Sequence, residues 1–375
     1  MVSIKKVLLV IACALTFAVF HKKNTIREEE SVVNVYDWYG MIPVEVLLEF
    51  ERETGVRVQY DVYDNNEVLE AKLLASNSGY DVVFPSASPY VARQIHAGVY
   101  QPLNKAALSN LTHLDPMIVK HMDKVDPHMV YAIPYYWGTL GFAYDEEKVK
   151  SSLSHVDLNS YAVLLDPENL KKLAPFGVSF LEESIDVFPV VLRFLGKNPN
   201  SQNVNDLTLA TDHLLKLRPY IRRFSSARMM NDLVMGDVCL AQTWSGEVQK
   251  AEEEAKELNR SIRYVIPKEG TTLWIDCIAI PKGAPHPKNA HIFINFILRP
   301  DISARLTNET KLPTVMLKAL PMVDEKIRHN PIIYPPKSVM VQLQLDQPQF
   351  DEAGIAFDRL RTRAWAHVRL NKKGS

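Results

Sequence analysis

Apolar and polar residues alternate at the start of the chain in a pattern that predicts three strands separated by two helices. Residues 32–36, 56–63 and 80–85 show the two-residue period of strands. Residues 43–55 and 65–79 place apolar side chains at helical spacing, with Asn65 or Asn66 as the cap of the second helix. This βαβαβ order predicts a parallel sheet with helices on its faces.

Two short sequences follow the first and third of these strands, DWYG at 37–40 and PSAS at 85–88. Ligands of open α/β sheets bind beyond the carboxyl ends of the strands. We therefore interpret Trp38 and Tyr39 as facing a ligand cleft. The alternative is a hydrophobic cap over the edge of the sheet, and position along the chain leaves both readings open.

The rest of the chain predicts a second α/β unit that is joined to the first by long strands. Residues 131–145 and 273–284 are interpreted as strands that cross between two lobes. Other predicted elements are helices near 186–196 and at 212–221, a strand at 237–244, a helical segment at 286–306 and an amphipathic C-terminal helix. Two lobes joined by several strands form a hinge around a cleft.

Length and composition fit this two-lobed interpretation. The 375 residues are 47% hydrophobic, which is enough for two cores. Lys plus Arg (43) nearly balance Asp plus Glu (44), so the chain has no basic field that would attract nucleic acid. Recognition of a charged ligand must therefore be local, inside a pocket.

The N-terminus has the layout of a secretory signal. Lys5 and Lys6 precede an uncharged apolar run at 7–20, which is short for a membrane-spanning helix. We expect residues 1–25 to be a signal peptide that exports the protein to the periplasm. Because the small-residue cleavage site is poor, an uncleaved anchor is the alternative.

Motifs for metal, nucleotide and hydrolase chemistry are missing from the sequence. Cys239 and Cys277 lie singly inside apolar runs, which favours two buried thiols over a disulfide. No HExxH, CxxC, GxxxxGK[ST], GxGxxG or GxSxG sequence occurs. We predict neither a metal nor a cofactor.

Several segments place an aromatic residue close to an acid. Trp274 and Asp276 share one face of their predicted strand because the side-chain period of a strand is two. Further candidates are Trp244 with Glu247, and Glu183 with Asp186. Aromatic faces and carboxylates together suit a slender organic cation, since rings attract an ammonium by roughly 0.5–2 kcal/mol and a charged hydrogen bond contributes about 1.5–3 kcal/mol.

The sequence resembles the bacterial periplasmic polyamine-binding proteins, the putrescine and spermidine receptors of ABC importers, and is most similar to the putrescine branch. The likeness runs from about residue 32 to 370. It is carried by FERETGVRVQYDVYDNNEVLEAKL, YDVVFPSAS, AGVYQPL, IPYYWGT, LGKNPNS, IPKEG, NFILRPD, NPIIYPP and DRLRTRAW. The resemblance implies a two-lobed α/β fold of the type II periplasmic binding protein class, with mainly parallel sheets, that closes on its ligand.

The resemblance also implies a set of ligand-binding residues. The family's aromatics match Trp38, Trp244 and Trp274, and its first-lobe serine matches Ser86. Its acids match Asp186, Glu247 and Asp276, with Glu183 where the spermidine branch has an additional acid. Asp186 replaces the usual Glu, and Glu247 replaces the Asp of the putrescine branch.

The first loop departs from the family pattern. The family's acid is Gly40, its tyrosine is Met41, and a further tyrosine of the cleft wall is Leu312. Removing one member of a buried ion pair costs about 3–5 kcal/mol, and micromolar binding amounts to only about −8 kcal/mol. We therefore expect a ligand preference that differs from plain putrescine, towards a cation with one weakly basic or uncharged end, unless Tyr39 or Asp37 turns inward to compensate.

The resemblance implies a monomeric solute-binding protein that delivers a polyamine to an ABC permease in the inner membrane. We expect lobe 1 to comprise 32–140 plus 275–325, and lobe 2 to comprise 141–274 plus 326–375. One alternative is a ligand sensor that docks on a membrane receptor. A second is an enzyme on this scaffold, for which Cys277 beside Asp276 is the single candidate nucleophile.

Overall fold

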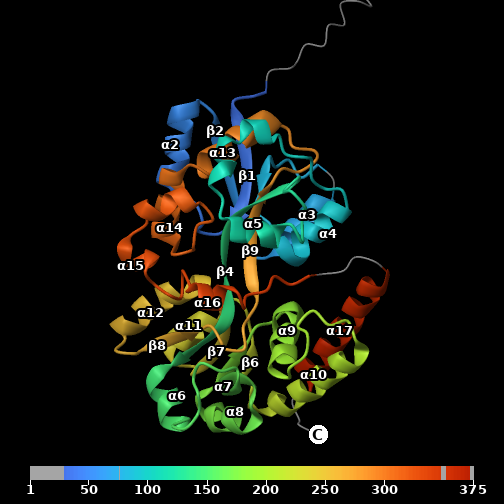
Figure 1. Ribbon diagram of the computed structural model, residues 1–375, viewed down its shortest axis with the longest axis vertical. Helices are drawn as coiled ribbons and strands as arrows, with labels where there is room; N and C mark the ends of the chain where they lie inside the picture. Colours follow the sequence, from blue (N-terminus) through green and yellow to red (C-terminus); the bar gives the residue numbers. More distant parts are fainter. Residues whose placement is uncertain (1–28, 76, 348–351, 372–375) are drawn as a thin grey trace, which may run out of the picture.

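The computed structural model describes residues 29–75, 77–347 and 352–371 of the chain. The predicted signal segment 1–25 lies outside these residues. Two lobes are stacked along the long axis, and the strands β4 and β9 run from one lobe into the other (Figure 1). Within the described residues, none of the helices combines the length and the hydropathy needed to cross a bilayer.

Strands from both lobes join in one nine-stranded sheet. Its order is β2-β1-β3-β9-β4-β7-β5-β6, and β8 pairs with β4 beside this path. The strands are β1 Val32–Trp38, β2 Arg57–Tyr63, β3 Val82–Val83, β4 Ala132–Asp145, β5 Val178–Phe180, β6 Arg223–Phe224, β7 Leu240–Trp244, β8 Ile262–Val265 and β9 Leu273–Ala279.

The predicted βαβαβ unit is confirmed in the first lobe. β1 pairs in parallel with both β2 and β3, and the two connections are the helices α2 (Val44–Thr54) and α3 (Asn66–Leu74). Gly55 ends α2 in the left-handed conformation with φ 71°, which glycine adopts without steric cost. Asn65 is the cap of α3, since its side chain accepts a hydrogen bond from the Val68 amide at 2.9 Å.

Both predicted crossing strands are confirmed. Every residue of β4 is buried. Its first half pairs with β9, and its second half pairs with β7 and β8. These crossing pairs are antiparallel, whereas the other strands of each lobe pair in parallel. The sheet is therefore mixed at the lobe junction, where the sequence predicted mainly parallel pairing.

The remaining helices cover the sheet. The predicted helical segment 286–306 forms two helices, because Pro300 lacks an amide hydrogen and begins a new one. The helices are α4 Ala92–His96, α5 Pro116–Met122, α6 Glu146–Ser152, α7 Ala162–Leu165, α8 Pro167–Leu173, α9 Ser184–Phe194, α10 Val204–Leu217, α11 Met229–Met235, α12 Val248–Glu257, α13 Pro287–Ile297, α14 Pro300–Thr310, α15 Glu325–Arg328, α16 Lys337–Met340 and α17 Glu352–Leu370.

Each lobe has its own hydrophobic core, and the cores correct one lobe boundary. Ile327, Ile333 and Leu345 pack in the core of the first lobe, although residues 326–375 were expected in lobe 2. Trp365 of α17 does pack in the second core. The chain therefore leaves lobe 1 after Leu345, because its apolar residues up to that point are buried against the first sheet.

Candidate ligand-binding site at the lobe junction

A chain of hydrogen bonds connects the start of α3 to β9 at the lobe junction. Ser86 Oγ donates to Asp276 Oδ1 at 2.7 Å, and Asn66 Nδ2 donates to Ser86 Oγ at 3.0 Å. Asn66 Oδ1 also accepts the Ser86 amide at 3.1 Å. The single hydroxyl hydrogen of Ser86 is therefore committed to Asp276, so towards a ligand Ser86 can act only as an acceptor.

Asp276 combines burial with an incomplete set of partners. The residue is 8% exposed, and burial raises the pKa of its carboxyl to about 7, against the lowering effect of the Ser86 hydrogen bond. At neutral pH the protonated and ionised forms are therefore both populated. A cation bound beside Asp276 would supply the missing counter-charge and favour the ionised form.

Trp274 lies two residues before Asp276 on the same face of β9. Its indole is seated against Gly138 of β4, where a Cβ atom would overlap with Trp274 Cζ2. Gly246 of the second lobe is also close, since a Cβ atom there would lie 3.7 Å from the same ring carbon. Trp274 Nε1 is buried and has no hydrogen-bond partner among the described residues. The half-buried ring thus forms an apolar surface beside the Asp276 carboxyl.

Asp37, Trp38 and Tyr39 at the first loop differ in how deeply they are buried. Trp38 is half-buried and donates from Nε1 to the Phe84 carbonyl at 2.9 Å. Asp37 turns inward and is fully buried, whereas Tyr39 is 80% exposed. Of the two residues considered as compensation for Gly40, Asp37 is therefore the one directed into the protein, and the structure does not bring Tyr39 to the other predicted residues.

Asp37 accepts two hydrogen bonds inside the first lobe. Its donors are the Trp38 amide at 2.7 Å and the Tyr60 hydroxyl at 3.0 Å. Burial raises the pKa of Asp37 well above its usual range, and the charge of Asp276 raises it further. Asp37 is therefore a buried carboxyl of the first lobe that is not exposed to a ligand.

The acids of the second lobe gather at the start of α9. Burial raises the pKa of Asp186 well above its usual value, with a further contribution from Glu183, and a hydrogen bond with the Trp244 side chain opposes this. Ser226 Oγ donates to Glu183 Oε2, and burial also raises the pKa of Glu183. Trp244 at the end of β7 is thus an aromatic neighbour of Asp186.

Glu247 lies on the second-lobe side of the junction, and Leu312 belongs to the core of the first lobe. Glu247 is more exposed than the other predicted acids, although desolvation by surrounding protein raises its pKa. Leu312 is 5% exposed, and its Cδ2 would lie 2.7 Å from a Cβ atom on Gly246. Leu312 therefore packs beside Gly246 as an apolar wall without a hydroxyl group.

Comparison with known proteins identifies the family of the chain. Residues 45–334 match the model of the bacterial extracellular solute-binding protein family. The chain belongs to this family. It is 42% identical over 356 residues to the putrescine-binding periplasmic protein PotF of Escherichia coli, covering 93% of this chain and 94% of that protein. It is 40% identical to the putrescine-binding periplasmic protein SpuD of Pseudomonas aeruginosa, covering 92% and 93%.

A solved structure supports the same assignment of the fold. The spermidine/putrescine ABC transporter substrate-binding protein PotD of Streptococcus pneumoniae superposes with a TM-score of 0.80 at 25% identity, covering 92% of this chain and 100% of that one. The two-lobed α/β solute-binding fold predicted from the sequence is confirmed. Both relatives are named as putrescine-binding periplasmic proteins.

Cys277 of this solute-binding protein does not have the surroundings of a nucleophile. The residue is fully buried, and burial raises the pKa of its thiol well above the usual value, with the charge of Asp276 adding to the effect. A neutral, inaccessible thiol is a poor nucleophile. Cys239 is also buried, and both cysteines are free thiols, so they do not form the disulfide that the sequence left open.

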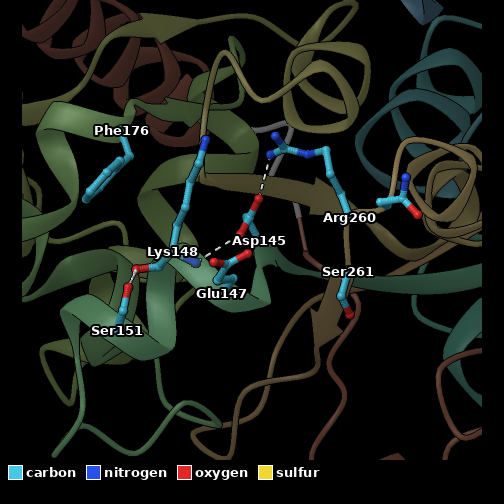
Figure 2. A pocket seen from close by; sticks show the side chains of 8 residues that line it. Asp145, Glu147, Lys148, Ser151, Phe176, Arg260 and Ser261 are labelled. Atoms are coloured by element: carbon cyan, nitrogen blue, oxygen red, sulfur yellow. Dashed lines mark hydrogen bonds and ion pairs between the residues drawn. The ribbon is translucent and has the colours of Figure 1, made fainter.

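A separate hollow lies at the far end of β4 from the junction (Figure 2). It has a volume of about 310 Å³ and is lined by residues that include Asp145, Lys148 and Arg260. Arg260 Nη2 pairs with Asp145 Oδ2 at 2.5 Å, and Lys148 Nζ donates to the Gly236 carbonyl at 3.2 Å. Asp145, Lys148 and Arg260 in this hollow thus already have partners within the protein.

Asn66 and Asp37 are two junction residues that the predicted ligand set omitted. The sequence contained one usable signal for Asn66. Two consecutive asparagines begin α3, and only one can be the cap. Since Asn65 caps the helix, Asn66 is free to bind Ser86. The inward direction of Asp37 had no such signal, because it depends on the position of Tyr60 on the neighbouring strand.

Proposed function

We propose that this solute-binding protein captures a polyamine or a related small organic cation at the lobe junction and delivers it to an ABC permease in the inner membrane. The observation that carries the proposal is the pairing of a buried carboxyl at Asp276 with the half-buried indole of Trp274 on one face of β9. A cation beside them gains both a charged hydrogen bond and an aromatic contact.

The other predicted residues have roles that follow from their positions. Trp38 and Trp244 contact the methylene chain of the ligand from the two lobes. Ser86 accepts a hydrogen bond from the ligand while it holds Asp276. Asp186, Glu183 and Glu247 provide negative charge at the second-lobe end, where the pKa of each carboxyl is raised by burial. A bound cation relieves the desolvation cost of these carboxylates.

The ligand preference in this proposal differs from plain putrescine. Gly40 has no side chain, and nothing lies within 4 Å of the place where its Cβ atom would be. Leu312 provides no hydroxyl group at the cleft wall. The relatives named for putrescine are about 60% different in sequence at 40–42% identity, which leaves room for a changed specificity.

Location and partners follow from the relatives. Their names place them in the periplasm, and export through the predicted signal at 1–25 would bring this chain to the same compartment. There we propose that a monomer binds the cation, closes its lobes and docks on the permease. The sensor alternative differs in the docking partner, and copurification with a membrane receptor in place of a permease would favour it.

Isothermal titration calorimetry against putrescine, spermidine, agmatine, γ-aminobutyrate and glutamate tests the function. We expect at least one of the three polyamines to bind and the acidic amino acid glutamate not to bind. The matched controls are Asp276→Asn, which should lose binding, and Asp212→Asn on the exposed face of α10, which should keep it. Equal, tight binding of putrescine would contradict the altered preference, and binding of glutamate alone would contradict the function.

A further inference from the structure

Asp346 lies on a third chain segment at the lobe junction, outside the predicted ligand set. The segment runs parallel to the start of β9, with a bridge between Thr272 and Gln344. The Leu273 amide donates to the Gln344 carbonyl at 2.9 Å, and the Gln344 amide donates to the Thr271 carbonyl at 3.1 Å. Asp346 lies two residues beyond this bridge.

The same edge of β9 bridges to Ser86 at Asp276. Along this edge, the residue that bridges to Gln344 comes first, Trp274 follows two residues later, and Asp276 follows two residues after that.

Asp346 has a buried oxygen without a partner. Its Oδ1 is buried and makes no hydrogen bond among the described residues, although buried polar atoms in folded proteins are nearly always paired. Burial raises the pKa of this carboxyl to about 7, while Arg193, Arg361 and a hydrogen bond from Thr272 act in the opposite direction. Arg193 donates to Gln344 Oε1 at 3.5 Å, and Arg361 pairs with Asp358 at 3.0 Å.

Asp346 is also electrostatically coupled to the acids of α9. Its charge raises the pKa of Asp186, so the two carboxyl groups lie close enough to oppose each other's ionisation. None of the ion pairs within 4.0 Å found among the described residues includes Asp186 or Asp346. Neither of these two neighbouring carboxyl groups has an ion-pair partner, and one buried oxygen of Asp346 has no hydrogen bond. A cationic group bound beside them would stabilise their ionised forms.

We propose that Asp346, together with Asp186, binds the second cationic group of a doubly charged polyamine, in place of the carboxylate that is missing at Gly40. This inference rests on the proposed function and extends it to the charge of the ligand. It replaces the expectation of an uncharged far end, because a desolvated carboxylate stabilises a neutral group less than a cation.

The test compares two ligands with the same four-carbon spacer. Agmatine is charged at both ends, whereas N-acetylputrescine is charged at one end only. In calorimetric titrations, Asp346→Asn should weaken agmatine binding by about 10-fold to 100-fold and change N-acetylputrescine binding by less than about 3-fold. Asp212→Asn should leave both affinities unchanged.

The ratio of the two affinities is measured within one protein, so it does not depend on the fraction that folds. Asp346→Glu, which keeps the charge, should retain a preference for agmatine. If Asp346→Asn leaves the ratio at its wild-type value, whether both affinities stay the same or fall together, Asp346 has a structural role only and the inference is wrong. If the wild-type protein binds none of the cations, the proposed function itself fails, and this is a different outcome.

Discussion

Asp276 is subject to two opposing requirements. A ligand cation needs its ionised carboxylate, whereas its burial favours the neutral acid. Ser86 and Asn66 resolve part of this conflict by directing one hydroxyl hydrogen to Oδ1. The negative charge of Asp276 is still only partly compensated, and this destabilises the ligand-free protein. We therefore expect the site to favour ligand binding at the expense of stability.

The Asp276→Asn variant should separate these two effects. Binding should weaken at least 100-fold, as expected for loss of about 3 kcal/mol from a buried charge pair. The folded-state pKa of about 7 exceeds the unfolded value, so the wild-type carboxyl lowers stability progressively as pH rises from about 4 through 7. At pH 8 the ligand-free variant should therefore have a free energy of unfolding about 2–4 kcal/mol larger than wild type, and it should unfold at a higher temperature.

Thermal unfolding of both proteins between pH 4 and 8 measures this difference. It should be small near pH 4 and grow until it is constant above pH 7. Asp212→Asn provides the control for an exposed carboxyl. A stability difference that does not vary with pH would contradict the account of Asp276.

Cation binding should also be coupled to proton release. Burial raises the pKa of Asp276 and of Asp346 to about 7, and a bound cation favours the ionised forms. Affinity should therefore fall as pH decreases from 8 to 6, by on the order of tenfold per pH unit for each proton released. Calorimetry at pH 7 in buffers of different ionisation enthalpy measures the protons, and zero release would rule out this coupling.

Individual site residues differed in how well the sequence predicted them. The pairing of Trp274 with Asp276 followed from the two-residue period of a strand. The direction of Tyr39 did not, because Gly40 adopts φ 77° and the chain turns there. Asp346 was missed because its neighbours come from β9, more than seventy residues earlier in the chain. Contacts of that kind depend on the fold and leave no local pattern.

At the scale of elements, β4 and β9 position the site together. Gly138 of β4 pairs with Trp274 of β9 in register, and the absence of a side chain at Gly138 allows the indole to lie against the strand. The hydrophobic pattern predicted both crossing strands and the βαβαβ unit. It did not predict their antiparallel pairing, since two crossing strands look alike in sequence whichever way they run. The sequence analysis predicted one helical segment where α13 and α14 are separate helices, although Pro300 indicates a helix start at that position.

Replacing Gly138 with alanine should displace Trp274 without unfolding the protein. The added Cβ atom would overlap with the indole, so the ring must move away from the Asp276 carboxyl. We expect the affinity for the best-binding cation to fall by about tenfold or more, since a cation–π contact contributes roughly 0.5–2 kcal/mol. Gly283→Ala is the control, because a Cβ atom there meets a single side-chain atom at 3.2 Å.

Fluorescence and titration of the two alanine variants check this prediction. The Gly138 variant should show changed tryptophan emission together with weaker binding, while the Gly283 variant should match wild type in both. Unchanged affinity in the Gly138 variant would show that the position of the Trp274 ring does not matter for binding.

At the scale of the whole molecule, the lobes are joined by β4 and β9 (Figure 1). Site residues belong to both lobes, so a ligand that contacts Asp276 and Asp186 at once bridges the junction. Several strands that cross together allow a hinge motion while they keep the two cores intact. The predicted boundary at residue 325 was too early, because Ile327, Ile333 and Leu345 are buried in the core of the first lobe.

Ligand binding should bring the lobes closer together. Small-angle X-ray scattering should show a smaller radius of gyration for the wild-type protein with a saturating cation than without it. Asp276→Asn at the same cation concentration should show no change, because the site is not filled. An unchanged radius for wild type under conditions of proven binding would argue against lobe closure.

A crystal structure with the best-binding cation tests the central claim most directly. The account predicts a cationic nitrogen within hydrogen-bond distance of Asp276 and the carbon chain of the ligand against the Trp274 ring, between the two lobes. A ligand bound elsewhere, for example in the hollow beside Asp145 and Arg260, with the lobe junction filled by water alone, would contradict it.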